Sequence, residues 1–181
     1  MAQERVAVIF QLVDGSELSG YVTPIIMGAK TFTYSNEPKG QLNKMKLEKV
    51  NRMVSTDGEK EYVYEVVHIL NPKNDKSTGL FVLRIVVEGH MNLYHFQGYS
   101  GSFHEFFIKP NPEAKGVYSA ANADFGTSKI AKKSQEIWNK RFKKSGAKFF
   151  LDHPEITQDI NEGKIDTKRM DELVIRYNKS K

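Results

Sequence analysis

LFVLRIVVEGHMNLYHF, residues 80–96, is the stretch of sequence that decides the fold class. Residues 80–87 are rich in β-branched and aromatic side chains, and residues 91–96 alternate large and polar side chains with a period of two. Between them, Glu88-Gly89-His90 supplies the glycine that a tight turn favours. The stretch therefore predicts a β-hairpin in the centre of an antiparallel sheet.

Further segments with strand periodicity lie on both sides of this hairpin. Asp14-Gly15 and Asp57-Gly58 are strong turn signals, so they predict short connections between neighbouring antiparallel strands. The predicted strands cover residues 5–13, 17–25, 30–34, 44–54, 61–70, 80–87, 91–96 and 102–108. About eight strands with short connections favour a small barrel or a strongly bent sheet over residues 1–108.

The composition changes after residue 108. Residues 109–126 contain two prolines and two glycines without usable periodicity, and they are interpreted as a connecting loop. Thr127 or Ser128 then caps a helix whose apolar side chains recur at helical spacing and are expected to dock on the sheet. The residues of this apolar face are Ile130, Ile137, Trp138 and Phe142.

Two more helices are predicted near the end of the chain. Asp152 or His153 caps the first of these, Pro154 occupies its first turn and Gly163 ends it. Asp166 caps the last helix, whose apolar face carries Met170, Leu173, Val174 and Tyr177. The sequence thus predicts an α+β fold: a β domain at 1–108, a connecting loop at 109–126 and a three-helix subdomain at 127–181 packed on the strands.

Composition excludes several function classes. Apolar residues make up 39% and aromatic residues 11% of the chain, and no apolar run approaches the ~20 residues that a membrane-spanning helix needs. The chain has no cysteine, which excludes disulfides, zinc–thiolate sites, iron–sulfur clusters and a thiol nucleophile.

The turn and the end of the chain carry a family resemblance. The DG-x-x-x-x-G pattern at Asp14–Gly20 and the ending FFLDHPEITQDINEGKIDTKRMDELVIRYN, residues 149–178, resemble exported β-rich proteins of Bacteroidetes-type bacteria that have a helical tail. Many such relatives carry a cysteine where this chain has His153, so any shared thiol chemistry is lost. The resemblance implies export to the periplasm or cell surface and no particular activity. Ala2-Gln3 fits the remainder of a cleaved signal peptide, and a cytoplasmic location is the alternative.

Charge is concentrated in the helical part. Residues 127–181 hold 14 Lys and Arg against 8 Asp and Glu, whereas residues 1–126 hold 13 against 14. Within residues 129–148 there are eight basic residues and one acid, Glu136. This helix could neutralise phosphates of a nucleic acid or lie on an anionic lipid surface, but we expect a solvated helix face. The candidate polyanion-binding residues are Lys132, Lys133, Lys140, Arg141, Lys143 and Lys144.

Aromatic residues form a second candidate site. At strand spacing such residues usually pack in the core or against a neighbouring strand, and the alternative is a platform for a sugar or peptide ligand. The candidate platform consists of Tyr62, Tyr64, Tyr94, Tyr99 and Phe103.

The remaining chemistry-bearing residues match no catalytic or metal-binding motif. His90, His95 and His104 are close in sequence, but their spacing matches no zinc signature, so no metal and no cofactor is expected. The carboxylates include no spaced pair that could act as acid and base. We expect a non-enzymatic, exported binding or scaffolding protein. The alternatives are a nucleic-acid-binding protein that uses helix 129–148 and, third, a hydrolase of envelope polymers.

Overall fold

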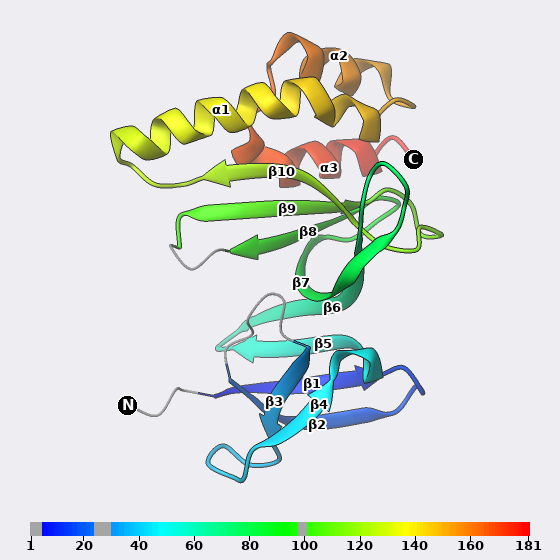
Figure 1. Cartoon of the computed structure of the whole chain (residues 1–181), viewed down its shortest axis with the longest axis vertical. Helices are drawn as coiled ribbons and strands as arrows, with labels where there is room; N and C mark the ends of the chain where they lie inside the picture. Colours follow the sequence, from blue (N-terminus) through cyan, green and yellow to red (C-terminus); the bar gives the residue numbers. More distant parts are fainter. Residues whose placement is uncertain (1–4, 24–29, 98–100) are drawn as a thin grey trace. The chain divides into compact units, whose positions relative to one another are not determined.

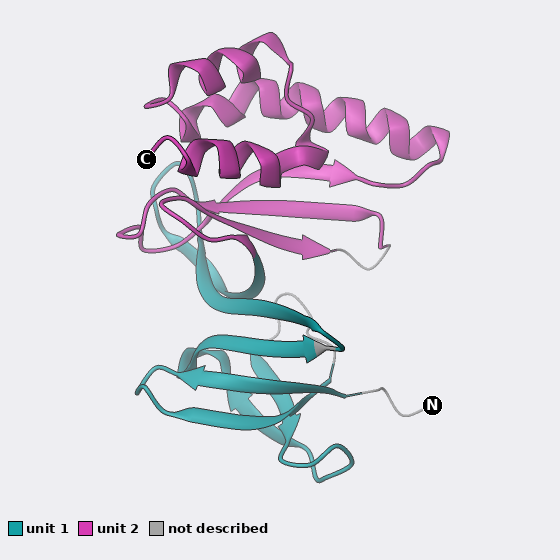
Figure 2. Ribbon diagram, turned by 180° about the vertical axis from the view of Figure 1, so that it is seen from behind, with its two compact units in different colours: residues 1–85 teal, residues 86–181 magenta. Residues whose placement is uncertain are grey.

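The structure is a computed structural model that describes residues 5–23, 30–97 and 101–181. These residues form ten strands and three α-helices (Figure 1). The chain divides into two compact units, residues 1–85 and 86–181, which have separate colours in Figure 2. The α+β class is therefore confirmed, whereas the number of strands is ten and not eight.

Unit 1 is an antiparallel sheet whose strands are hydrogen-bonded in the order β7-β6-β5-β1-β2-β3-β4. The bounds are β1 (Val6–Leu12), β2 (Glu17–Val22), β3 (Thr31–Ser35), β4 (Asn43–Lys46), β5 (Val50–Asp57), β6 (Lys60–Leu70) and β7 (Ser77–Val87), whose last two residues belong to unit 2. In the described residues β4 ends the hydrogen-bonded row of strands, so the sheet is open and, of the two predicted forms, the small barrel is wrong.

The strand predicted at 44–54 is in fact two strands. A 3-10 turn, Leu47–Lys49, separates β4 from β5, and this explains why the segment shows no single period. The core of unit 1 forms around Phe10, which is fully buried and packs edge-to-face on Phe32, with ring centroids 5.3 Å apart.

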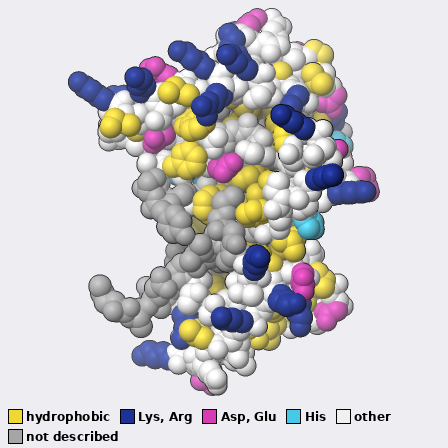
Figure 3. All heavy atoms as spheres, in the orientation of Figure 1, with side chains coloured by type: hydrophobic (Ala, Val, Ile, Leu, Met, Phe, Trp, Pro, Cys, Tyr) yellow, Lys and Arg dark blue, Asp and Glu magenta, His cyan; other side chains and the backbone are white. Residues whose placement is uncertain are grey.

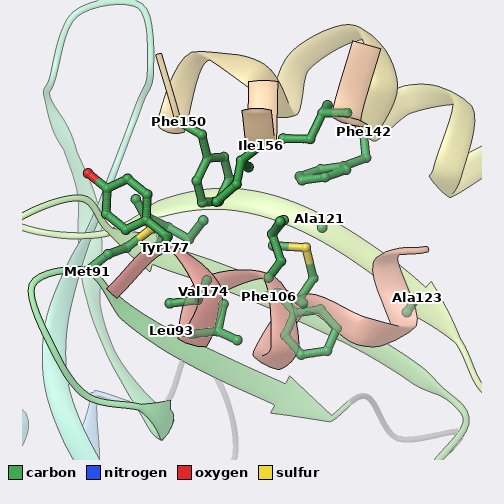
Figure 4. Close-up of a cluster of buried hydrophobic side chains, with 14 residues drawn as sticks. Met91, Leu93, Phe106, Ala121, Ala123, Phe142, Phe150, Ile156, Val174 and Tyr177 are labelled. Carbon is green, nitrogen blue, oxygen red and sulfur yellow. The ribbon is translucent and has the colours of Figure 1, made fainter. Parts of the chain in front are cut away.

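Unit 2 combines three strands with the three helices. β8 (Asn92–Gln97), β9 (Phe103–Lys109) and β10 (Tyr118–Asp124) are antiparallel in the order β10-β9-β8. The helices are α1 (Lys129–Ser145), α2 (Pro154–Glu162) and α3 (Met170–Asn178), with 3-10 turns at Gly146–Phe149 and Thr167–Arg169. Figure 4 shows how side chains from the helices and strands converge in one core, and this confirms that the helical part packs on strands.

β10 lies inside residues 109–126, which were predicted to form a connecting loop. Its core-facing residues are the small Ala121 and Ala123, which lack the bulk by which a strand is usually recognised. The same small side chains let α1 pack closely on β10. For this reason β8, β9 and β10 form a unit with the helices, and the two compact units divide between Ile85 and Val86 and not at residue 108.

The cap of α2 is as predicted, and the predicted cap of α3 lies one 3-10 turn before that helix. His153 caps α2 and Pro154 follows it, while Gly163 ends the helix with φ of 77°, a conformation that favours glycine. Asp166 caps the 3-10 turn that leads directly into α3, where its Oδ1 accepts a hydrogen bond from the backbone N–H of Lys168. The buried residues of α3 are the four predicted, namely Met170, Leu173, Val174 and Tyr177.

Helices that could cross a bilayer are absent from the described residues.

Candidate functional site

Helix α1 carries the strongest candidate site, and its rotation about its own axis decides which residues the site can use. Ser128 is the N-cap, and its Oγ accepts a hydrogen bond from the backbone N–H of Ala131. The buried residues of α1 are Ala131, Gln135 and Phe142, which recur at i, i+4 and i+11 and so lie on one face. This face packs on β10 and on the other helices.

The predicted apolar face of α1 is therefore wrong for its two isoleucines. Ile130 is 80% exposed and Ile137 is 42% exposed, whereas Phe142 is buried as predicted and Trp138 is half-buried. The physical reason is Gln135, a polar residue that takes the centre of the buried face. Sequence periodicity could not find this face, because one of its three members is an amide.

Gln135 is the centre of a hydrogen-bond network that fixes α1 in place. Its Oε1 accepts from the backbone N–H of Asp124 at 2.8 Å, and its Nε2 lies 2.7 Å from Oδ1 of Asp166 and 2.9 Å from Oγ1 of Thr167. Thr167, fully buried, donates from its hydroxyl to the backbone oxygen of Asn122 at 2.8 Å. The network joins α1 to β10 and to the turn before α3, so the orientation of α1 is specific.

This orientation turns the basic side chains of α1 outward. Figure 3 shows Lys and Arg side chains gathered over this helix, with hydrophobic side chains between them. The exposed basic residues at and just after α1, here called the basic surface, are Lys129, Lys132, Lys133, Lys140, Arg141, Lys143, Lys144 and Lys148. All six residues of the predicted polyanion site belong to it.

The basic surface is accompanied by a single acid on α1, the exposed Glu136. None of its eight side chains forms an ion pair within the described part of the chain; the two other interactions are those of Arg141 over the ring of Trp138, 4.6 Å from the centroid, and Lys148 over Phe149 at 4.8 Å. Eight positive charges within twenty residues therefore face solvent against one negative charge, that of Glu136.

The other two helices of unit 2 show the opposite arrangement. They surround an open hollow of about 420 Å³ whose cations are all paired: Arg176 with Asp159 at 2.8 Å, Arg169 with Glu172, and Lys164 with Glu162. The arginine hydrogen bond lowers the pKa of Asp159, and Arg169 lowers the pKa of Glu172 in the same way. The charged side chains around this hollow pair with one another, whereas the basic surface on α1 carries eight cations and one acid, which makes it the better candidate for binding an anion.

The predicted aromatic platform is distributed over both units. Tyr62 and Tyr64 are half-buried on β6 of unit 1, where Arg84 lies over the Tyr62 ring and burial raises the pKa of Tyr64. In unit 2, Tyr94 is fully buried on β8, and Phe103 lies against Trp138 with ring centroids 6.0 Å apart. Tyr99 is outside the described residues. The five-residue platform stays a prediction, and only Phe103 lies beside the basic surface.

Two of the three histidines considered above, His95 and His104, are hydrogen-bonded to each other. Nε2 of His95 and Nδ1 of His104 are 2.7 Å apart, and Nε2 of His104 is 3.3 Å from the backbone oxygen of Gly101. His90 lies elsewhere, with its ring 6.3 Å from that of Tyr177. In the described residues no group of three or more His, Asp or Glu has the arrangement of a metal site. The hydrogen bond between His95 and His104 occupies one ring nitrogen of each.

Among the carboxyl groups of the described residues, Glu105 on β9 is the one whose pKa is clearly raised. Burial is the cause, partly offset by a hydrogen bond from the Ser119 hydroxyl at 2.9 Å. Its cross-strand partner on β10 is Asn122. Sequence reasoning could not identify this perturbed carboxyl, because β10, which carries its hydrogen-bond partner Ser119, was not predicted.

No protein-family model, curated protein or solved structure matches this chain.

Proposed function

We propose that the protein is a non-enzymatic binding module that holds a polyanion on the basic surface of α1. The observation that carries this proposal is the contrast within unit 2: the cations around the hollow beside α2 and α3 are paired with acids, and the eight cations at α1 are not.

The stability of the helix explains only part of this charge distribution: Lys143 and Lys144 in the last turn suit the helix dipole, and Glu136 precedes Lys140 by four residues, but the other lysines have no such role. A solvated helix gains a few tenths of a kcal/mol from each Glu–Lys pair at i,i+4, and like charges at that spacing cost a similar amount. Lys129–Lys133 and Lys140–Lys144 are like-charge pairs at i,i+4. The first turn contains no acid and begins with Lys129, where the helix dipole favours a negative charge. A bound polyanion would relieve all three unfavourable interactions.

Binding to a long inorganic polyphosphate at low salt tests the proposal. The variant Lys133→Gln/Lys140→Gln/Lys144→Gln removes three charges from α1, and each charge near an anionic surface contributes about 1 kcal/mol, so affinity should fall about a hundredfold. The matched control is Lys44→Gln/Lys60→Gln/Lys73→Gln, which removes three exposed lysines of unit 1. It changes net charge equally and should keep nearly all the affinity. Equal losses in both variants would reduce the effect to net charge and contradict a specific surface.

The location is part of the proposal. The resemblance of residues 149–178 to exported proteins of Bacteroidetes-type bacteria supports a periplasmic or surface-exposed module. Fractionation of cells that produce the protein from its own gene tests this directly. Recovery with the cytoplasmic fraction would instead favour the nucleic-acid-binding alternative, particularly if an oligonucleotide is bound tighter than micromolar at physiological salt.

A further inference from the structure

We infer that the polyanion held by α1 is the surface of an anionic lipid bilayer. This inference rests on the proposed function and adds the chemical class of the partner. It rests on two exposed isoleucines of α1, Ile130 and Ile137. A partner that binds only through charge would make no favourable contact with them.

The exposed face of α1 contains a row of isoleucine and lysine side chains, here called the mixed stripe. Its members are Ile130, Lys133, Ile137, Lys140 and Lys144. Successive members are three or four residues apart, so all five side chains lie along one side of the helix. At 1.5 Å per residue the mixed stripe is roughly 20 Å long. A helix that lies parallel to a flat surface would present this whole stripe to it.

The aliphatic members of the mixed stripe are unusually open to solvent. Ile130 is the most exposed large hydrophobic residue in the described chain at 80%, and Ile137 is 42% exposed in the middle of the helix. Burial of an isoleucine side chain stabilises by about 1.5–3 kcal/mol, so these residues gain most from a partner that offers an apolar layer. A nucleic acid presents phosphates and sugars to lysines, and its bases stack on flat aromatic rings, so neither part offers an apolar layer to an aliphatic isoleucine.

The arrangement of charge around the isoleucines fits the headgroup region of a bilayer. Lysine stems are apolar and their ammonium groups reach past them to polar surroundings, so Lys133 and Lys144 can contact headgroup phosphates while the isoleucines reach the acyl boundary. Arg141 and Trp138 lie on the flank of the stripe, with the guanidinium 4.6 Å from the ring centroid. Trp138 is half-buried, and indole rings favour the membrane–water interface.

Vesicles separate this inference from the proposed function. The protein is titrated with vesicles of phosphatidylcholine containing phosphatidylglycerol, with pure phosphatidylcholine vesicles, and with a single-stranded oligonucleotide. Of the two vesicle types, we expect the protein to bind the anionic one and not pure phosphatidylcholine. Binding should shift the emission of Trp138 to the blue, and the signal is specific because Trp138 is the only tryptophan in the chain.

The deciding variant is Ile130→Ser/Ile137→Ser, which leaves every charge in place. It should bind anionic vesicles at least tenfold more weakly and bind the oligonucleotide as the unchanged protein does. Ile9→Ser/Ile175→Ser is the control, because it removes two exposed isoleucines from other elements, 44% and 41% exposed. This control should bind vesicles normally.

Two results would overturn the inference and leave the proposed function standing: tight oligonucleotide binding without vesicle binding, or vesicle binding that the Ile130/Ile137 change does not weaken. Absence of salt-sensitive binding to vesicles, oligonucleotide and polyphosphate alike would contradict both.

Discussion

Replacing Gln135 by leucine should destabilise unit 2 severely, although leucine is apolar, similar in size and a better helix former. Gln135 is only 7% exposed, and its amide makes hydrogen bonds on both sides. Leucine would leave the backbone N–H of the half-buried Asp124 without this partner, which costs about 1–3 kcal/mol. It would also remove the hydrogen bond to the Asp166 carboxylate, and bonds to charged groups contribute about 1.5–3 kcal/mol.

The combined loss should be about 3–5 kcal/mol, since the two effects share one network and are not fully additive. Guanidinium unfolding followed by Trp138 fluorescence measures it, because the indole is one helical turn from Gln135 and reports on unit 2. Lys140→Gln on the exposed side of the same helix is the control, with an expected change below ~0.5 kcal/mol. A Gln135→Leu variant as stable as the original protein would refute the view that a polar network and not an apolar stripe orients α1.

Three more predictions concern unit 2. Gly89→Ala should destabilise it by about 1–3 kcal/mol, because a methyl group there would overlap the amide of Asn178, which bonds to both backbone groups of Met91; melting curves measure this. Glu105 has a raised pKa in the folded state, so the folded protein binds the extra proton, and stability should fall as pH rises through the interval from the unfolded to the folded pKa. Glu105→Gln should remove that fall, and an unchanged pH profile of unfolding would contradict it. Truncation after Gly126 should yield an aggregating fragment, since it uncovers the core side chains of β8 and β9; a soluble fragment with unchanged melting would show instead that the helices are independent.

The parts of the fold that follow from local chemistry could be predicted from the sequence. His153-Pro154, Gly163 and Asp166 mark helix ends because capping depends on a few neighbouring atoms. The four buried residues of α3 follow from spacing alone, because that helix is apolar on one face and polar on the other.

The parts that depend on tertiary contacts could not be predicted. β10 is a strand because α1 packs against its alanines, and alanine has no preference for strands. The buried face of α1 is set by Gln135, whose partners come from β10 and from the turn before α3, far away in sequence. In consequence the six basic residues of the candidate site were found from the sequence, whereas the exposure of Ile130 and Ile137 beside them was not.

The salt dependence of polyanion binding tests the central claim most directly. With a single-stranded oligonucleotide as a probe of known charge spacing, log Kd should rise with log salt by about 0.7 for each phosphate that a lysine contacts. Lys133→Gln/Lys140→Gln/Lys144→Gln should make this slope shallower by about 2, while Lys44→Gln/Lys60→Gln/Lys73→Gln should leave it unchanged. Equal slopes for the original protein and the α1 variant would show that these lysines only solvate the helix, and the binding surface proposed here would be wrong.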